Sequence, residues 1–178
     1  MNRHDPLFKM VLAAIFLALA FVLPFFTGQI PEIGALLCPM HLPVLLCGFV
    51  CGPWWGLAVG FVAPLLRSLS LGMPPFFPTA VCMALELAAY GVTAGLLRRV
   101  LPRGKGYLYV SLLGSMLLGR AVWGLAMLLC AGLRGEAFTF AAFFAGAVTD
   151  ALPGILLQLV FIPPIVMITD KLLQEKTE

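Results

Sequence analysis

A series of long apolar runs, separated by short polar segments, limits this chain to few possible folds. Hydrophobic residues make up 62% of its 178 residues and charged residues only 11%, against roughly 25% charged in a typical soluble domain. A soluble core cannot absorb so much apolar surface, so most of it must face lipid. A membrane-spanning helix needs about 20 mostly apolar residues. The sequence therefore predicts an all-α integral membrane protein, built as one domain over residues 1–178.

The apolar runs predict a six-transmembrane-helix bundle whose second helix is short. The run Met40–Cys51 rises only about 18 Å, and Gly52-Pro53 is expected to end it. The longer runs are Leu7–Phe26, Trp54–Leu71, Pro78–Leu97, Tyr107–Ala131 and a long last helix, Ala137–Leu172. Residues 27–39 and 70–78 form two Gly- and Pro-containing loops on the same side of the predicted bundle.

Basic residues flank the predicted helices unevenly, which sets the expected orientation. One side carries Arg3, Lys9, Arg98, Arg99, Arg103, Lys105, Lys171 and Lys176. A loop on the other side carries only Arg134. Because cytoplasmic loops are enriched in Lys and Arg, both termini and the 98–106 loop are expected in the cytoplasm. The positive charge lies at membrane edges, so it does not indicate a nucleic-acid partner.

Four ionisable residues lie inside the predicted spans: Arg67, Glu86, Arg120 and Asp150. Each costs roughly 2.5–3.5 kcal/mol at the centre of a bilayer, so isolated charges are not expected there. Arg67, Glu86 and Arg120 belong to three different helices at similar outer depth. We expect them to converge beneath the two outer loops, with Asp150 nearer the middle of the membrane.

Two interpretations of these charges remain open. They could form a structural ion-pair network that ties helices together, or they could line an outward-opening pocket. Two stripes of neighbouring residues favour the pocket: Met83, Glu86 and Tyr90 on one helix, and Arg120, Trp123 and Met127 on another. Aromatic rings, flexible thioethers and a few placed charges are typical of small-molecule sites. Met or aromatic stripes alone more often belong to a core.

Three further residues complete the predicted binding set. His41 follows the first outer loop and could hydrogen-bond a ligand or cap its helix. Met73 lies in the second outer loop. Asp150 shares a helical row with Gly154 and Gln158, and it could line the lower pocket or, as the favoured role, pair with an arginine.

Small residues recur at four-residue spacing, which lets helix backbones approach closely in lipid. The glycine series, consisting of Gly48, Gly52, Gly56 and Gly60 together with Gly91 and Gly95, is expected to pack within the molecule. The Ala14/Ala18 face on the first helix could pack internally or meet a partner protein. The five cysteines are interpreted as small packing residues.

Catalytic and metal-binding motifs are absent from the sequence. It contains no GxxxxGK[ST], HExxH or GxSxG pattern and no His/Cys cluster with metal-ligand spacing. We therefore expect a protein without catalytic residues, metal or cofactor. If it moves a solute actively, the energy must come from another subunit or from an ion gradient.

The motifs, taken in order, resemble the substrate-binding S components of energy-coupling factor (ECF) vitamin transporters. They are Ala14-x-x-x-Ala18, CPMHLPVLLCGFVCGPWWG (residues 38–56), and GMPP followed by MALELAAYG (residues 72–75 and 83–91). The resemblance implies a bacterial plasma-membrane protein that binds a water-soluble vitamin or precursor. It also implies that Ala14 and Ala18 dock on a membrane coupling subunit, which two ATPase subunits drive with ATP.

The ligand and two competing functions stay open at this stage. The embedded arginines favour a carboxylate, which makes pantothenate the first guess. Riboflavin and pyridoxine-type or other heteroaromatic compounds also remain, because Trp123 and Tyr90 could stack on a ring. The alternatives are a stand-alone ion-coupled carrier and a small lipid-modifying membrane enzyme that uses Glu86 or Asp150 as its acid or base.

Overall fold

The computed structural model describes residues 5–27, 36–102, 104–135, 139–146 and 151–175. Every regular secondary-structure element in these ranges is a helix. The long helices are α1 (Pro6–Val22), α4 (Pro53–Leu71), α5 (Val81–Val100), α6 (Lys105–Arg134) and α8 (Leu152–Glu175). The shorter ones are η1 (Leu23–Thr27), α3 (His41–Cys51), η2 (Phe76–Ala80) and α7 (Phe140–Phe144). Five spans are long and apolar enough to cross a membrane, and α3 is apolar but shorter. The prediction of an all-helical, multi-pass membrane protein is confirmed.

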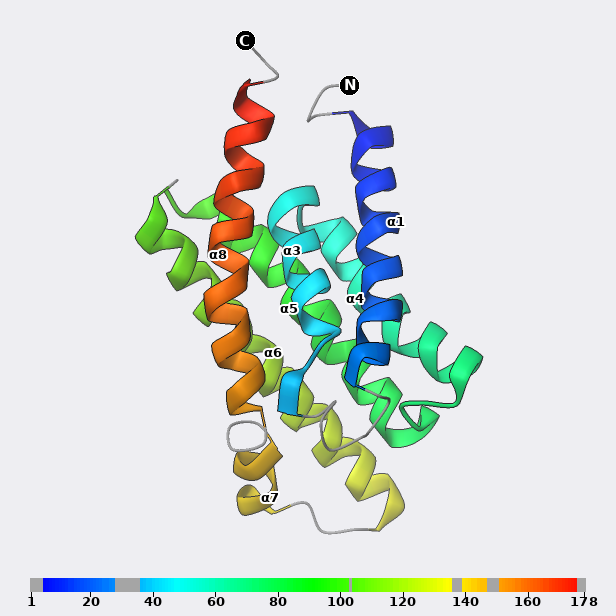
Figure 1. Ribbon diagram of the computed structural model, residues 1–178. Helices are drawn as coiled ribbons and strands as arrows, with labels where there is room; N and C mark the ends of the chain where they lie inside the picture. Colours follow the sequence, from blue (N-terminus) through cyan, green and yellow to red (C-terminus); the bar gives the residue numbers. More distant parts are fainter. Residues whose placement is uncertain (1–4, 28–35, 103, 136–138, 147–150, 176–178) are drawn as a thin grey trace.

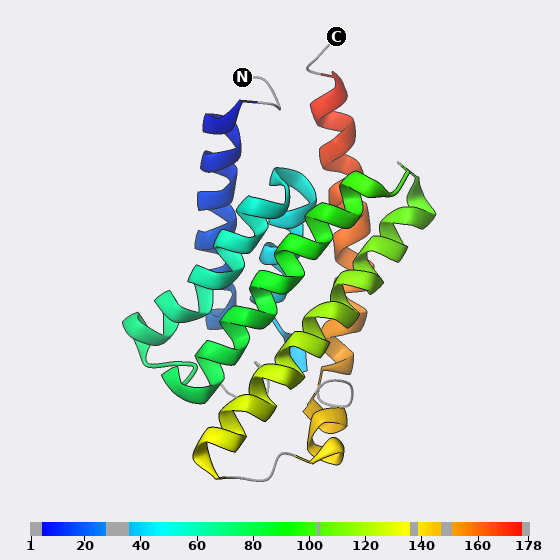
Figure 2. The ribbon, with the colours of Figure 1, turned by 180° about the vertical axis from the view of Figure 1, so that it is seen from behind.

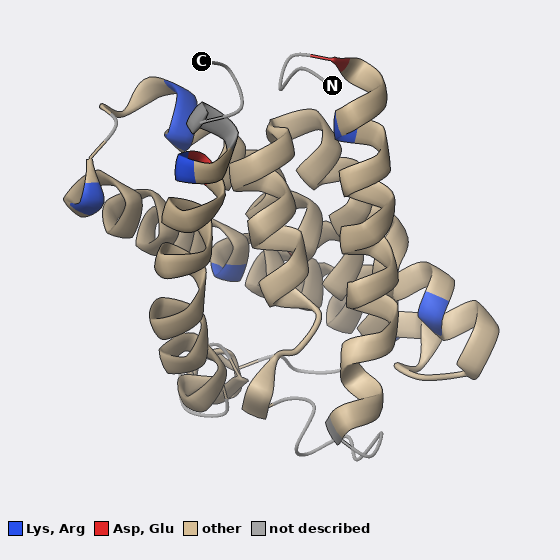
Figure 3. Ribbon diagram, turned by 45° about the horizontal axis from the view of Figure 1, so that its top comes forward, with Lys and Arg blue, Asp and Glu red and all other residues tan. Residues whose placement is uncertain are grey.

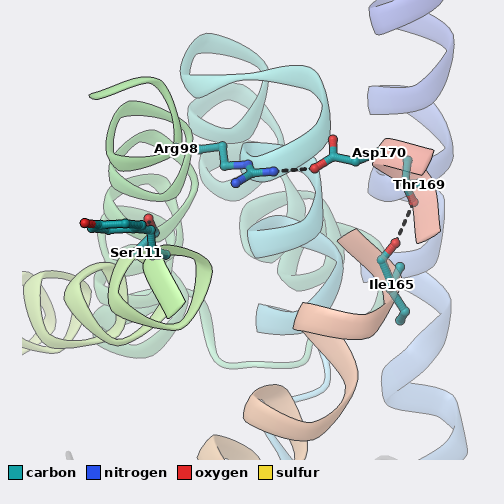
Figure 4. Close-up of polar contacts among 6 residues, drawn as sticks. Arg98, Ser111, Ile165, Thr169 and Asp170 are labelled. Carbon is teal, nitrogen blue, oxygen red and sulfur yellow. Dashed lines mark hydrogen bonds and ion pairs between the residues drawn. The ribbon is translucent and has the colours of Figure 1, made fainter. Parts of the chain in front are cut away.

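The first residue of α1, the last turn of α8 and the α5–α6 connection lie at one end of the bundle, which we call the terminal end (Figures 1 and 2). Most of the described charged residues lie near it (Figure 3). Arg98 on α5 forms an ion pair there with Asp170 on α8 (Figure 4). The assignment of this end to the cytoplasm stays a prediction.

Glycine backbones set the distance between the central helices. A Cβ atom added to Gly91 on α5 would lie 2.2 Å from the carbonyl oxygen of Gly56 on α4. One added to Gly60 would lie 2.3 Å from the carbonyl oxygen of Leu87. No side chain fits at either position, so α4 and α5 touch through their backbones. The predicted internal packing of the glycine series is confirmed.

The turn between α3 and α4 depends on Gly52. Its φ of 102° is a conformation that residues with a Cβ rarely adopt, and Pro53 then begins α4 with a φ suited to a first helical turn. This turn lets α3 sit inside the bundle as a buried helix, with Val44, Leu45 and Cys47 fully covered. The short helix is thus a core element.

One predicted helix start is confirmed and one predicted helix is wrong. Phe77 precedes a proline and takes an extended conformation (φ −122°, ψ 133°), so the continuous helical path starts at Pro78 as expected and becomes regular α-helix at Val81. The single long helix expected over Ala137–Leu172 is instead described as α7 and α8. Pro153 lacks an N–H and its ring clashes with a preceding helical turn, so a helix begins at this point more readily than it continues through.

Candidate functional site

Glu86 is the centre of a buried polar cluster formed by three helices. It lies in the second turn of α5 and is only 1% exposed. Its Oε1 atom is 3.0 Å from Nη1 of Arg120 on α6 and 3.4 Å from Nε2 of His41 at the start of α3. A buried carboxylate needs a nearby positive charge, and Arg120 supplies it. We call His41, Glu86, Tyr90 and Arg120 the polar cluster.

Arg120 has two further neighbours at the edge of the cluster. Its Nη2 atom lies 3.5 Å from the Cys38 sulfur, and its Cζ atom lies 6.0 Å from the centre of the Trp123 ring. Burial raises the pKa of the Cys38 thiol to about 11. The thiol is therefore neutral at physiological pH, and among the described residues Glu86 is the acidic side chain that pairs with Arg120.

Aromatic rings form one wall of the site. Tyr90 is 1% exposed and meets the His41 ring edge to face, with the ring centres 5.2 Å apart. It packs tightly on α6, because a Cβ added to Gly119 would lie 2.8 Å from the tyrosine ring. Trp123 stacks on Phe143 of α7 at 6.2 Å between centres. Three of these four rings can also hydrogen-bond, which suits a ligand with both apolar and polar parts.

Several atoms of the polar cluster have unused hydrogen-bonding capacity. Within the described part of the chain, both ring nitrogens of His41 and the Nε atom of Arg120 are buried without a hydrogen-bond partner. The 3.4 Å approach of His41 to Glu86 has the distance of an ion pair but not the geometry of a hydrogen bond. Buried polar groups nearly always have partners. Donor and acceptor atoms of the cluster, the Glu86 Oε1 atom among them, are thus left without a hydrogen-bond partner in the described structure.

Arg67 does not join the cluster, so the predicted convergence of three charges is wrong for this residue. Its Nη1 atom donates to the carbonyl oxygen of Phe21 at 2.6 Å, and its guanidinium lies 4.9 Å from the centre of the Phe25 ring. The last carbonyls of a helix lack intrahelical partners, and a cation there is favourable. The end of α1 thus competes for Arg67 and holds it.

The other predicted residues occupy varied positions. Met83 is half-buried on the same side of the core as Glu86 and Tyr90. Met73 is half-buried in the connection between α4 and η2. Asp150 lies outside the described residues. Ala14 and Ala18 are exposed on α1.

The sequence interpretation missed two neighbours of the site. Cys38 was assigned to packing with the other cysteines, although it stands three residues before His41. Phe143 could not be placed because the last helix was expected to be continuous, whereas α7 folds across α6 and brings it to Trp123. A cysteine one helical turn from a candidate histidine was the available signal for the first of them.

Two cavities lie elsewhere in the described structure. One, of about 230 Å³, is at the terminal end and is lined by Pro6, Lys9, Cys51, Trp54, Trp55 and Arg99. The other, of about 460 Å³, is an apolar groove between α6 and α7 lined by Ala121, Gly124, Leu125, Leu128, Thr139, Phe140 and Phe143. Neither cavity is lined by the polar cluster, which is closely packed.

The fold and the cluster together define a multi-pass membrane protein with a polar site inside its helical bundle. Comparison with known families identifies the family of this membrane protein. The family model for "ECF transporter, substrate-specific component" matches residues 8–166, and the chain belongs to this family. Searches of curated proteins and of solved structures gave no match. The resemblance noted in the motifs is confirmed, and the protein is a membrane substrate-binding subunit for uptake.

Proposed function

We propose that this subunit binds a water-soluble vitamin or vitamin precursor at the polar cluster. The observation that carries the proposal is the burial of Glu86 between Arg120 and His41, with hydrogen-bonding capacity left over on both partners. If the ion pair were purely structural, its buried polar atoms would be expected to be fully hydrogen-bonded, because each buried unpaired polar group costs about 1–3 kcal/mol. A polar ligand that enters the cluster would offset this cost.

The charges of the cluster favour a ligand with little net charge. Glu86 and Arg120 are 3.0 Å apart and offset each other, and His41 adds a donor and an acceptor. Pantothenate was expected from two arginines, but Arg67 is held at the end of α1. A carboxylate ligand must compete with Glu86 for the remaining arginine. We therefore place a heteroaromatic vitamin of the pyridoxine type ahead of pantothenate, with Tyr90 and Trp123 available beside its ring.

The uptake step is proposed to need partner subunits. Ala14 and Ala18 are exposed on α1, whereas Ala13 and Ala20 are buried against the bundle. Helix α1 therefore exposes two small residues at four-residue spacing, a pattern that permits close helix contact in lipid. We assign this face to a membrane coupling subunit driven by two ATPases, in a bacterial plasma membrane. ATP would be used by those partners, and the chain itself would need no cofactor.

The binding proposal is tested with protein purified in detergent. Small molecules that co-purify are identified by mass spectrometry, and pyridoxine, pantothenate and riboflavin are titrated by calorimetry. Arg120→Gln and Glu86→Gln are expected to weaken binding at least tenfold. Arg134→Gln, at the far end of α6, is the matched control and should bind normally. A protein that binds no vitamin of the panel and carries none on purification would contradict the proposal.

A second measurement separates this function from a stand-alone ion-coupled carrier. The subunit is reconstituted into liposomes without ATPase subunits and given the ligand that calorimetry identifies, with and without an ion gradient. Our proposal predicts binding but no accumulation. Gradient-driven accumulation would favour the carrier instead.

A further inference from the structure

The cavity at the terminal end has the composition of an anion site at a membrane surface. We call it the terminal pocket, and its six lining residues come from α1, α3, α4 and α5. Each lining residue lies within one or two turns of an end of its helix. Lys9 lies near the start of α1, Cys51 at the end of α3, and Arg99 in the last turn of α5. The pocket therefore lies at the depth where spanning helices meet water.

Among the residues that the structure describes, the two cations of the pocket take part in no ion pair. Within the described residues, the ion pairs involve His41, Arg98 and Arg120 on the basic side, and neither Lys9 nor Arg99 takes part. The neighbouring Arg98 is paired with Asp170, so the adjacent arginines differ in this respect. Two cations that face one cavity with no acidic residue in its lining favour an anionic occupant.

The backbone of the pocket adds to its positive potential. Gly52, which precedes α4, has no side chain that could cap the helix, and the Arg99 guanidinium approaches it so closely that a Cβ there would lie 3.0 Å from Nη2. The first N–H groups of a helix and its dipole favour negative charge. Helix α4 has 19 residues, and Trp54 and Trp55 in its first turn line the pocket.

We propose that the terminal pocket binds the phosphate of an anionic membrane phospholipid. The tryptophans distinguish a lipid from a soluble anion. Trp54 is 73% exposed, as suits an indole at the level of lipid headgroups, and it borders the same cavity as Lys9 and Arg99. The headgroup phosphate lies between the two cations, and the acyl chains follow the exposed apolar surface beside Trp54. Basic pockets between membrane helices suit acidic headgroups on electrostatic grounds.

Quenching of tryptophan fluorescence by brominated lipids tests this proposal. The full chain, in a Trp123→Phe background so that only Trp54 and Trp55 report, is reconstituted in mixtures of phosphatidylcholine and brominated phosphatidylglycerol. The affinity for phosphatidylglycerol relative to phosphatidylcholine is expected to fall about 25-fold in Lys9→Gln/Arg99→Gln, because each basic residue near an anionic surface contributes about fivefold. Lys9→Arg/Arg99→Lys should retain the preference.

The matched control is Lys105→Gln/Lys171→Gln, which removes the same charge from exposed positions of the same end. This control should keep the lipid preference, and thermal unfolding of all variants shows whether they are folded. An equal preference for phosphatidylglycerol in Lys9→Gln/Arg99→Gln and Lys105→Gln/Lys171→Gln would overturn the proposal. So would a wild-type preference abolished by millimolar inorganic phosphate, since the pocket would then hold a soluble anion.

Discussion

Glu86 on α5 and Arg120 on α6 form an ion pair of 3.0 Å inside the helical bundle, with the carboxylate 1% exposed. Arg67, a second arginine buried among apolar helices, instead donates to the carbonyl oxygen of Phe21 at the end of α1. The two arginines thus have different roles: one faces the candidate binding site and the other holds the end of the first helix. The predictions below separate these roles.

Breaking the Glu86–Arg120 pair from one side should cost stability and ligand affinity together. Glu86→Gln leaves the Arg120 charge buried without compensation, which costs about 3 kcal/mol. The double variant Glu86→Gln/Arg120→Gln removes both charges and should recover more than half of that loss while ligand binding stays at least tenfold weaker. Thermal unfolding and calorimetry on the same preparations measure both. A double variant that binds like the unmodified protein would make the pair purely structural.

Replacement of Arg67 should affect stability alone. Arg67→Gln loses a charged hydrogen bond to Phe21, and such bonds contribute about 1.5–3 kcal/mol. The affinity for the ligand is expected to stay within twofold, because the guanidinium contacts the end of α1 and not Glu86. Unfolding and ligand titration check the two statements separately. A tenfold loss of affinity in a folded Arg67→Gln protein would return this residue to the binding site.

A methyl group at Gly91 should separate α4 from α5. The added Cβ would lie 2.2 Å from the carbonyl oxygen of Gly56, and backbone atoms cannot move aside as a side chain can. Overpacking of this kind costs about 1–3 kcal/mol or more. Gly132→Ala on α6 is the control, since a Cβ there meets nothing within 4 Å. Thermal unfolding should show a large loss for Gly91→Ala and none for Gly132→Ala.

Bulk on the exposed face of α1 should block uptake and leave ligand binding intact. Ala14→Leu/Ala18→Leu adds bulk to the α1 face proposed for the coupling subunit but touches no residue of the polar cluster. Uptake in cells that carry the whole transporter is expected to fall at least tenfold, while calorimetry of the isolated subunit is unchanged. Ala58→Leu, at an exposed position on α4, controls for added bulk in the membrane. Normal uptake by the double variant would place the partner elsewhere.

Local sequence was sufficient to predict the helices and their close contacts. Hydropathy over about 20 residues reports the solvent around a helix, and Gly52-Pro53 and the glycine series act through backbone geometry that depends on the residues themselves. The same is true of the charged and aromatic stripe with Glu86 and Tyr90, whose spacing puts both residues on one side of α5. These properties do not depend on distant parts of the chain.

Which charges meet was decided only by the packed bundle. Arg67 and Arg120 are alike in sequence, since each is a single arginine within an apolar helix. Their partners differ because the two helices are oriented differently about their own axes and have different neighbours. Helix α4 directs Arg67 toward the free carbonyls of α1, whereas α6 directs Arg120 toward Glu86 and Cys38. Helix orientation about its own axis is set by contacts with other helices, and apolar surroundings on all sides leave no local pattern that reveals it.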